Sequence, residues 1–196
     1  AELLIGDISL LSEALEEETK FKNVSLIYGS LTLGKTEDQL KDDIPRPSEE
    51  LSNKLEILEG LYDYILIDCP PSLKLLTSNA LAASTHVIVP IESGSQYGLY
   101  GVTDLINHLS KIRRVNPELE LLGALLIKHD ERHNVCKLIK DEAFNQVGEL
   151  LHTTIPMSTK VNQAAILQQP LSSVDKNSKV RKAFETLAQE IVQRVG

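Results

Sequence analysis

Residues 62–92 read YDYILIDCPPSLKLLTSNALAASTHVIVPIE, and this stretch decides the fold. Its first seven residues, 62–68, have the β-branched and aromatic content of a strand buried on both faces, and the two prolines that follow end it. Residues 86–91, HVIVPI, repeat this character after a segment of helical period at 73–83. We therefore expect a strand, a helix and a second, parallel strand.

The same alternation continues toward the C-terminus. Residues 119–128 (LELLGALLIK) form a third apolar segment, and helical periodicity covers 97–114, 134–150 and 178–195. Strands that alternate with helices in this way pack as a parallel sheet covered on both sides. The sequence predicts an α/β fold, with a doubly wound and mostly parallel sheet and helices on both faces.

Toward the N-terminus the pattern is weaker. We expect a helix at 8–18, a short strand at 23–28 and another helix at 48–61. Before the last helix lies KTEDQLKDDIPRP (35–47), which is polar, acidic and broken by two prolines, so it predicts a surface segment. There is no internal repeat and no second boundary in the sequence, and residues 1–196 are expected to form a single domain.

Composition narrows the possible function classes. The chain has a net charge of -8 and no apolar run near the ~18 residues that a membrane span needs. Its acidic first residues show no secretory signal, which predicts a cytoplasmic protein. Cys69 and Cys136 stand apart from any metal-binding spacing and are expected to be ordinary thiols. The acidic balance argues against a protein coated in basic residues, although a local basic face could still bind DNA.

Asp68 is the residue on which the chemistry depends. A carboxylate that ends a strand of a parallel sheet can hold Mg²⁺, directly or through water, against nucleotide phosphates, because ligands sit beyond the carboxyl ends of the strands. The alternative is an Asp that caps the following turn. Position alone leaves both interpretations open.

The surrounding residues resemble one protein family. Residues 62–92 are similar to the segment of ParA-type partition ATPases in which a Walker B strand ends at an Asp, followed by x-Pro-Pro-Ser and a Thr-x-Asn-Ala-Leu helix. The resemblance continues through KHDERHN, TTIPMSTKVNQAAILQQPL and VDKNSKVRKAFETLAQEIV, and it is strong from residue 60 to 195. It implies a P-loop NTPase-like ATPase that forms a homodimer around ATP and Mg²⁺ and binds DNA non-specifically. It also implies that a ParB-like or cargo adaptor protein helps to position plasmids, chromosomes or other cargo.

The resemblance also assigns residues. It implies that Asp68 is the catalytic-site carboxylate that holds the water shell of Mg²⁺, that Pro70 and Pro71 shape the loop that senses the γ-phosphate, and that Pro156 lies near the adenine. In the related MinD branch, the dipeptide after the Walker B Asp is usually followed by Ala-Gly, and a basic amphipathic C-terminal tail binds membrane. The Pro-Pro-Ser sequence and the tail IVQRVG favour the ParA branch, with a nucleoid-associated location and no membrane binding.

The family's phosphate-binding loop has no counterpart before Ala1, so we expect this chain alone not to bind ATP productively. GSLTLGKT, from Gly29 to Thr36, does satisfy G-x-x-x-x-G-K-T. A real phosphate loop opens a packed helix whose N-terminus faces the phosphates. The residues that follow are rich in carboxylates and offer only Leu40 and Ile44 for burial, so we interpret GSLTLGKT as a chance match.

DNA contact in this family comes from scattered lysines and arginines that bind phosphate without sequence preference. The resemblance places Lys160, Lys179, Arg181 and Lys182 at such positions, with a solvated helix face as the alternative for each. Met157 stands where many members have Arg, and Gln163 where many have Glu, so these two positions depart from the family pattern. The end of helix 97–114, with Lys111, Arg113 and Arg114, is a weaker candidate because cations there also suit the helix dipole.

Three functions follow as hypotheses. The first is a DNA-associated partition or cargo-positioning ATPase. The second is a non-catalytic ParA-like adaptor that keeps the fold but has lost nucleotide binding. The third is a metabolic member of the wider superfamily, such as an iron protein of reductases, although Cys69 and Cys136 do not match the cysteine pattern such a cluster needs.

Overall fold

The computed structural model describes residues 4, 14–16, 19, 21–30, 33–175 and 177–196. The chain forms two compact units, Ala1–Thr85 with Leu109–Leu119, and His86–His108 with Glu120–Gly196. We refer to them as unit 1 and unit 2. That residues 1–196 make a single domain stays a prediction.

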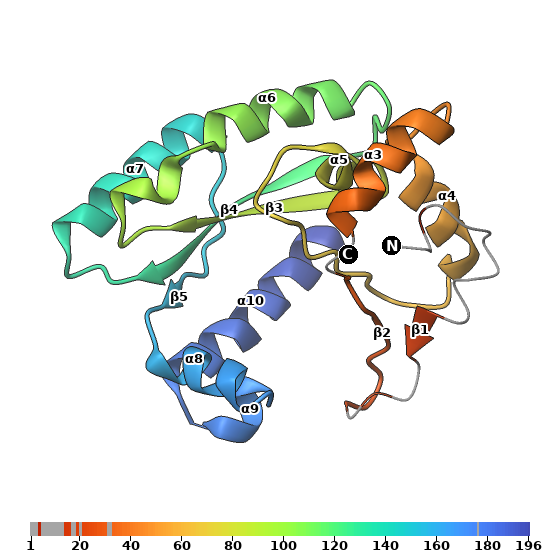
Figure 1. The fold of residues 1–196 in the computed structure, drawn as a ribbon. Helices are drawn as coiled ribbons and strands as arrows, with labels where there is room; N and C mark the ends of the chain where they lie inside the picture. The colour runs from red at the N-terminus through yellow and green to blue at the C-terminus, as the bar shows by residue number, and fades with distance from the viewer. Residues whose placement is uncertain (1–3, 5–13, 17–18, 20, 31–32, 176) are drawn as a thin grey trace. The chain divides into compact units, whose positions relative to one another are not determined.

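Unit 2 contains the parallel sheet. Strand β3 (His86–Glu92) pairs in parallel with β4 (Glu120–His129), and β4 pairs in parallel with the two-residue β5 (Ile155–Pro156), in the order β3-β4-β5 (Figure 1). The two longer strands lie where the sequence predicts them. The short β5 carries too few residues for an alternation pattern to reveal it.

Helices cover both faces of this sheet. On one face, α6 (Val102–Ile112) and α7 (Asn134–Val147) pack on a core formed by Val89, Ile91, Ala124, Leu126, Ile139 and Ala143, among others. On the other face, α10 (Lys179–Val195) packs through Val180 and Leu187 on Leu125 and Ile155. The α/β fold, with a mostly parallel sheet between two helical layers, is therefore confirmed.

Glycines set the helix boundaries in unit 2. The helix predicted at 97–114 is split into a 3₁₀ helix, η2 (Gln96–Leu99), and α6, with Gly101 between them at φ 78°. Gly148, at φ 83°, ends α7 in the left-handed conformation that favours glycine. The C-terminal helix begins where predicted, because the Ser178 hydroxyl accepts the N–H of Arg181. Helices α8 (Thr159–Ile166) and α9 (Leu171–Val174) lie between β5 and α10.

Unit 1 contains short elements. Strands β1 (Leu15–Glu16) and β2 (Leu26–Ile27) pair antiparallel, and β2 matches the predicted short strand. Helix α4 (Glu50–Leu55) continues into η1 (Glu56–Leu58), and α5 (Leu75–Ala82) lies within the predicted helix 73–83. Most of the helix predicted at 8–18 lies outside the described residues, but Leu15–Glu16 are a strand, so the prediction is wrong at that end.

The prediction of a surface segment at 35–47 is confirmed for most of its described residues, which are exposed or half-buried, but it missed a helix with a packed face. Residues Leu33–Asp43 form helix α3, in which Leu40 is fully buried and Glu37 is 8% exposed. Leu33, Glu37 and Leu40 are spaced i, i+4 and i+7, which places them on one helical face. The pattern was missed because Glu37 was counted as a solvated charge rather than as part of the packed face.

Residues 62–68 do not form the predicted central strand. The segment has no regular secondary structure and pairs with none of the described strands, and Leu66 is 90% exposed. A strand needs a neighbour to satisfy its N–H and C=O groups. The β-branched residues favour a strand, but they form one only where a neighbouring strand is available to pair with.

Candidate functional site

Asp68 lies at the end of residues 62–68 in unit 1. Its side chain is exposed, and among the described residues no donor is hydrogen-bonded to its carboxylate. The turn that follows is held without it, because Ser72 N–H donates to the Pro70 carbonyl at 2.8 Å and the Thr77 hydroxyl donates to the Ser72 carbonyl. This arrangement disfavours the capping alternative and leaves the carboxylate available to a cation.

Helix α5, which follows Asp68, is fixed by two polar side chains that the sequence analysis missed. Asn79, 1% exposed, accepts the N–H of Leu51 at 2.9 Å and donates to the Pro47 carbonyl at 2.7 Å. Glu37 accepts the N–H of Leu76 at 2.9 Å. These hydrogen bonds join residues 28 to 39 positions apart in sequence, so no local pattern reveals them.

GSLTLGKT begins after β2, and its last four residues are in α3, so a helix does open within the motif, contrary to our expectation. The glycines, however, do not have cradle geometry. Neither Gly29 nor Gly34 has a positive φ, and a Cβ at Gly29 would meet nothing closer than 3.9 Å. The preceding strand is also antiparallel to β1 rather than part of a parallel sheet. The interpretation as a chance match therefore rests on backbone geometry instead of on a missing helix.

In unit 2, the carboxyl ends of β3 and β4 are joined by polar contacts. Buried Ser93 places its Oγ 2.8 Å from His129 Nδ1, and Lys128 Nζ lies 2.8 Å from Glu92 Oε2. Burial lowers the pKa of His129, with Lys140 adding to this effect and Glu131 and Asp130 opposing it. Among the described residues, His129 Nε2 has no hydrogen-bond partner. The sequence analysis missed this pair, because a single Ser and a single His form no motif.

Pro156 is in strand β5, at the same end of the sheet as this pair. It pairs with His129 in the β4–β5 register, at the outer strand β5, where a proline costs no ladder hydrogen bond. The residue after His129 is Asp130, whose carboxylate accepts hydrogen bonds from Arg132 Nε at 2.9 Å and from the Arg132 backbone N–H at 3.0 Å. The hydrogen bonds from Arg132 hold the pKa of the Asp130 carboxyl well below its usual range.

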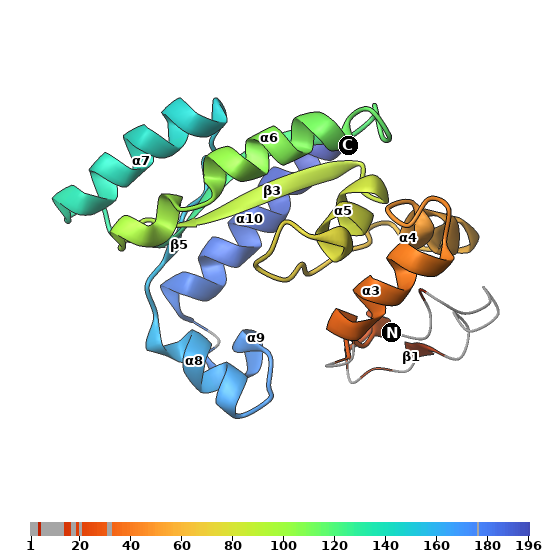
Figure 2. The same cartoon turned by 45° about the horizontal axis from the view of Figure 1, so that its top comes forward.

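The four predicted DNA-contacting residues gather at one end of unit 2. In Figures 1 and 2, α8, α9 and the start of α10 lie side by side. Lys160 is on α8, with Nζ 3.1 Å from Gln163 Oε1, and the other three are in the first turn of α10. Val180 is 1% exposed, so neighbouring Lys179 and Arg181 flank the buried face and Lys182 lies opposite it.

Charge also concentrates here. Residues 155–196 contain six Lys and Arg against three Asp and Glu, whereas residues 1–154 contain 14 against 25. Arg181 is the weakest of the four candidates, because its guanidinium lies 2.7 Å from Glu185 Oε1. In unit 1, Arg113 Nε donates to the Leu119 carbonyl at 3.0 Å, a contact that gives it a structural role.

Two searches of the described residues gave negative results. No three His, Cys, Asp or Glu side chains there are grouped so that they could hold a metal ion. None of the helices in that part of the chain is long and apolar enough to cross a membrane.

The family model described as AAA domain matches residues 1–121. The sporulation initiation inhibitor protein Soj of Bacillus subtilis is 30% identical over 192 residues, which are 97% of this chain and 74% of that protein. The chain belongs to the ParA/MinD family of partition ATPases. An uncharacterised protein of Pseudomonas putida is 38% identical over 146 residues, 74% of this chain but 55% of its own length. The chain thus spans about half the length of the first curated relatives it matches.

Solved structures of other proteins share this fold. A cobyrinic acid a,c-diamide synthase from Mycobacterium smegmatis, with bound ATP analogue and magnesium, matches with a TM-score of 0.72 and 31% identity over 81% of this chain and 64% of that one. Apo McdA of Cyanothece matches with a TM-score of 0.80 over 97% of this chain and 76% of that one, at 18% identity, which shows the fold alone. Nucleotide and magnesium binding therefore occur within the family.

Proposed function

We propose that this chain is the larger part of a ParA-type ATPase that positions DNA or another cargo. In the whole protein, ATP-dependent dimerisation creates a DNA-binding surface, and hydrolysis dismantles it. The observation that carries this proposal is the gathering of Lys160, Lys179, Arg181 and Lys182 at one end of unit 2, in a protein with a net charge of -8. Such a patch suits phosphate contacts, while the rest of the chain repels duplex DNA.

The nucleotide-binding residues are proposed from position and exposure. The exposed Asp68 carboxylate would hold the water shell of Mg²⁺, and the Pro70-Pro71 turn would respond to the γ-phosphate. Pro156, at the carboxyl end of the parallel sheet, is placed where ligands of such sheets bind and would lie near the adenine. The described residues offer no phosphate cradle, so we assign the cradle to no residue of this chain.

The DNA-binding proposal is tested by charge reversal in the full gene product with Mg-ATP. Changing Lys160 and Lys179 to Glu should weaken binding to all duplex sequences alike. With each phosphate contact that is lost, fewer counterions are released on binding. The magnitude of the slope of log K against log salt should therefore fall by about one per contact. The ATPase rate without DNA should stay unchanged.

A matched control is Lys137→Glu, since Lys137 is an exposed lysine of α7 in the same unit but outside the patch. It changes net charge in the same direction and should leave the salt slope intact. An unchanged slope in the Lys160 and Lys179 double variant would mean that the patch is misplaced. A change of preference between sequences would mean that base contacts, not phosphate contacts, are made there.

The second candidate is a non-catalytic adaptor, favoured by the lack of cradle geometry at Gly29 and Gly34. Sedimentation of the 196-residue chain with and without Mg-ATP should show no nucleotide-dependent dimer under either candidate. The same measurement on the full gene product separates them, because only the ATPase dimerises with ATP. We further propose a cytoplasmic, nucleoid-associated location and a ParB-like or cargo adaptor partner, on the strength of the Soj and ParA relatives.

A further inference from the structure

Residues 62–68 leave a large apolar surface of unit 1 open to water, and we call them the open segment. Tyr64, Ile65 and Leu66 follow one another, and their exposed fractions are 48%, 47% and 90%. Consecutive side chains of a strand point to opposite faces of a sheet, so this sequence would be apolar on both faces. Such a sequence is typical of a strand that is buried inside a parallel sheet.

The backbone of the open segment is unpaired as well. Among the described residues, no backbone hydrogen bond joins it to another strand. In the same part of the chain, β2 pairs with β1 alone, over two residues. Unpaired N–H and C=O groups beside apolar side chains form a template to which a further strand can add. The chemistry of this surface therefore selects a β-strand as its occupant.

Further apolar surface adjoins the open segment. Residues 23–25 and 61–64 line one hollow of unit 1. Val24 in this hollow is 48% exposed, and Leu61 is 69% exposed. The hollow shares residues 62–64 with the open segment, so the two form one continuous surface. A strand that pairs with the open segment thus has more apolar area to bury beside it, and this burial favours docking.

The length of the relatives points to the origin of the occupant. The matched part of this chain spans 74% of Soj and 76% of McdA, so about a quarter of each protein lies outside it. Unit 1 begins at Ala1, whereas the C-terminal helix α10 packs on the sheet of unit 2. Polypeptide that precedes Ala1 is therefore continuous with unit 1, where the open segment lies.

We propose that the open segment is the docking site of a β-strand that precedes Ala1 in the full gene product. The added strand pairs with residues 62–68 through backbone hydrogen bonds and buries Tyr64, Ile65 and Leu66. This inference rests on one part of the proposed function, namely that this chain is the larger part of a longer protein. It explains why a sequence with the composition of a central strand has no strand partner in the described part of unit 1.

Hydrogen exchange of backbone amides tests the proposal on the full gene product and on the 196-residue chain, both without nucleotide and DNA. Amides of residues 62–68 should exchange about 100-fold more slowly, or slower still, in the full gene product than in the chain. Amides of α5 in unit 1 and of β4 in unit 2 should be protected in both proteins, which shows that both units are folded. An open segment that exchanges equally fast in both proteins would overturn the proposal.

Two further outcomes would identify a different occupant and would also overturn the proposal. Protection of the open segment in the 196-residue chain, independent of protein concentration, would mean that residues of this chain cover it. Protection that increases with concentration would mean that a second copy covers it. The measurement uses neither ATP nor DNA, so its result is separate from that of the proposed function. A full gene product that protects the open segment but does not dimerise with ATP would contradict the ATPase proposal alone.

Two matched variants give a second readout. Leu66→Lys changes the open segment and Leu138→Lys changes α7 in unit 2, at leucines that are 90% and 67% exposed. In the 196-residue chain, both variants should leave the protection of α5 and β4 unchanged, because both side chains are in water. In the full gene product, Leu66→Lys should reduce the protection of residues 62–68 about tenfold or more, because a buried ammonium group is costly. Leu138→Lys should not reduce it, and equal effects of the two variants would contradict the docking of a strand on Leu66.

Discussion

The Glu37 carboxylate accepts the backbone N–H of Leu76 at 2.9 Å, so a residue of α3 caps α5, 39 positions further along the chain. The residue before α5, Lys74, makes no side-chain capping bond of its own. Glu37 therefore satisfies one of the N–H groups that every helix leaves open at its start. The contact links the helix that follows GSLTLGKT to the helix that follows Asp68.

Changing Glu37 to Ala should therefore destabilise unit 1. Loss of a capping carboxylate costs about 0.5–2 kcal/mol, and the buried position of Glu37 favours the upper half of that range. Urea unfolding measures the change. Asp38→Ala is the matched control, because Asp38 is an exposed carboxylate on the same helix and its loss should change the unfolding free energy by less than about 0.5 kcal/mol. Equal losses in both variants would show that helix propensity, not the cap, accounts for the effect.

What the sequence could predict depends on how local the cause is. Strands β3 and β4 and helices α7 and α10 follow from periodicity and from nearby residues such as Gly148 and Ser178. That residues 62–68 pair with none of the described strands could not be predicted, because strand pairing depends on a partner elsewhere in the chain.

The candidate site divides in the same way. Asp68, Pro156 and the α10 cations could be picked out by resemblance, because they belong to contiguous motifs. Glu37, Asn79, Ser93 and His129 could not, since each acts through a partner 28 to 39 residues away. Isolated polar residues of this kind look like surface residues until the fold brings their partners to them.

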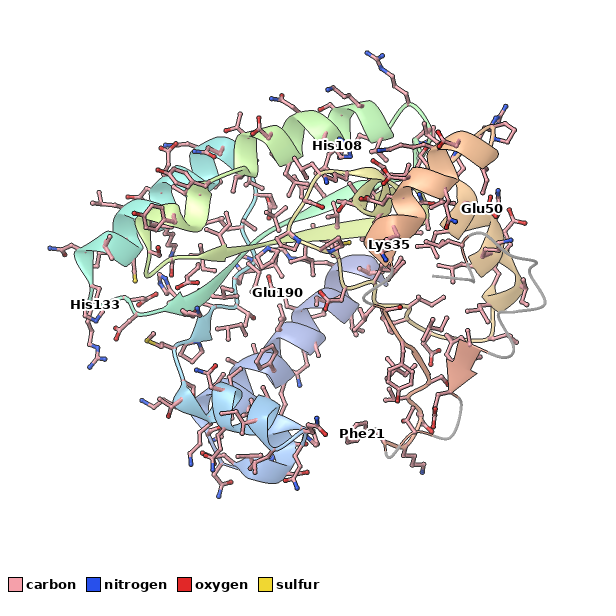
Figure 3. All side chains as sticks on the ribbon, in the orientation of Figure 1. Phe21, Lys35, Glu50, His108, His133 and Glu190 are labelled. Atoms are coloured by element: carbon pink, nitrogen blue, oxygen red, sulfur yellow. The ribbon has the colours of Figure 1, made fainter. Side chains whose placement is uncertain are left out.

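We expect Glu190 to make the stability of unit 2 decrease at acidic pH. Its carboxylate accepts the N–H groups of His152 and Thr153 at 2.7 and 2.8 Å and lies 3.0 Å from Arg194 (Figure 3). Burial alone would raise the pKa of Glu190, but these hydrogen bonds and the Arg194 charge together lower it. A carboxyl with a lowered folded pKa stabilises the fold above its unfolded pKa of 4.5, and this stabilisation is lost as pH falls through the folded value.

We expect Glu190→Gln to lower the unfolding free energy at pH 7 by about 1.5–3 kcal/mol, because charged hydrogen bonds to buried N–H groups are lost. The difference from the unchanged protein should begin to shrink below pH 4.5, where the unfolded chain takes up a proton at Glu190, and should be lost as pH falls through the lowered folded pKa. Urea unfolding at pH 7 and at pH 3.5 measures both. Glu185→Gln is the control on the same helix, since it removes an exposed ion pair with Arg181. A difference that stays constant with pH would contradict the assignment of the acid limb to Glu190.

We expect His129 to make the free energy of unfolding decrease as pH falls. A histidine whose pKa is raised by an acidic partner would have the opposite effect. Burial lowers its folded pKa below the unfolded value of 6.5, so the neutral form is favoured in the fold. Stability is therefore present above pH 6.5 and decreases as pH falls below it, because the unfolded chain takes up the proton more readily.

In His129→Gln, the loss of stability between pH 7.5 and 5.5 should be smaller than in the unchanged protein, as measured by thermal unfolding. The control is His133→Gln at the start of α7, whose side chain is 67% exposed (Figure 3). His133→Gln leaves the burial of His129 unchanged, so that variant should keep the full decrease. If His133→Gln flattens the profile and His129→Gln does not, the pH dependence has been assigned to the wrong histidine.

Two glycines give opposite expectations for the same substitution. A Cβ at Gly98 would lie 2.0 Å from the Glu92 carbonyl oxygen, and rigid backbone at that distance must shift, so Gly98→Ala should cost about 1–3 kcal/mol or more. Gly34 is in α3, with nothing within 4 Å of the new Cβ, so Gly34→Ala should stabilise the chain by about 0.5–1 kcal/mol through helix propensity. Urea unfolding of both variants measures the pair. A destabilised Gly34→Ala would show that this glycine has a conformational role in GSLTLGKT, and the motif would then have to be reconsidered as a phosphate-binding loop.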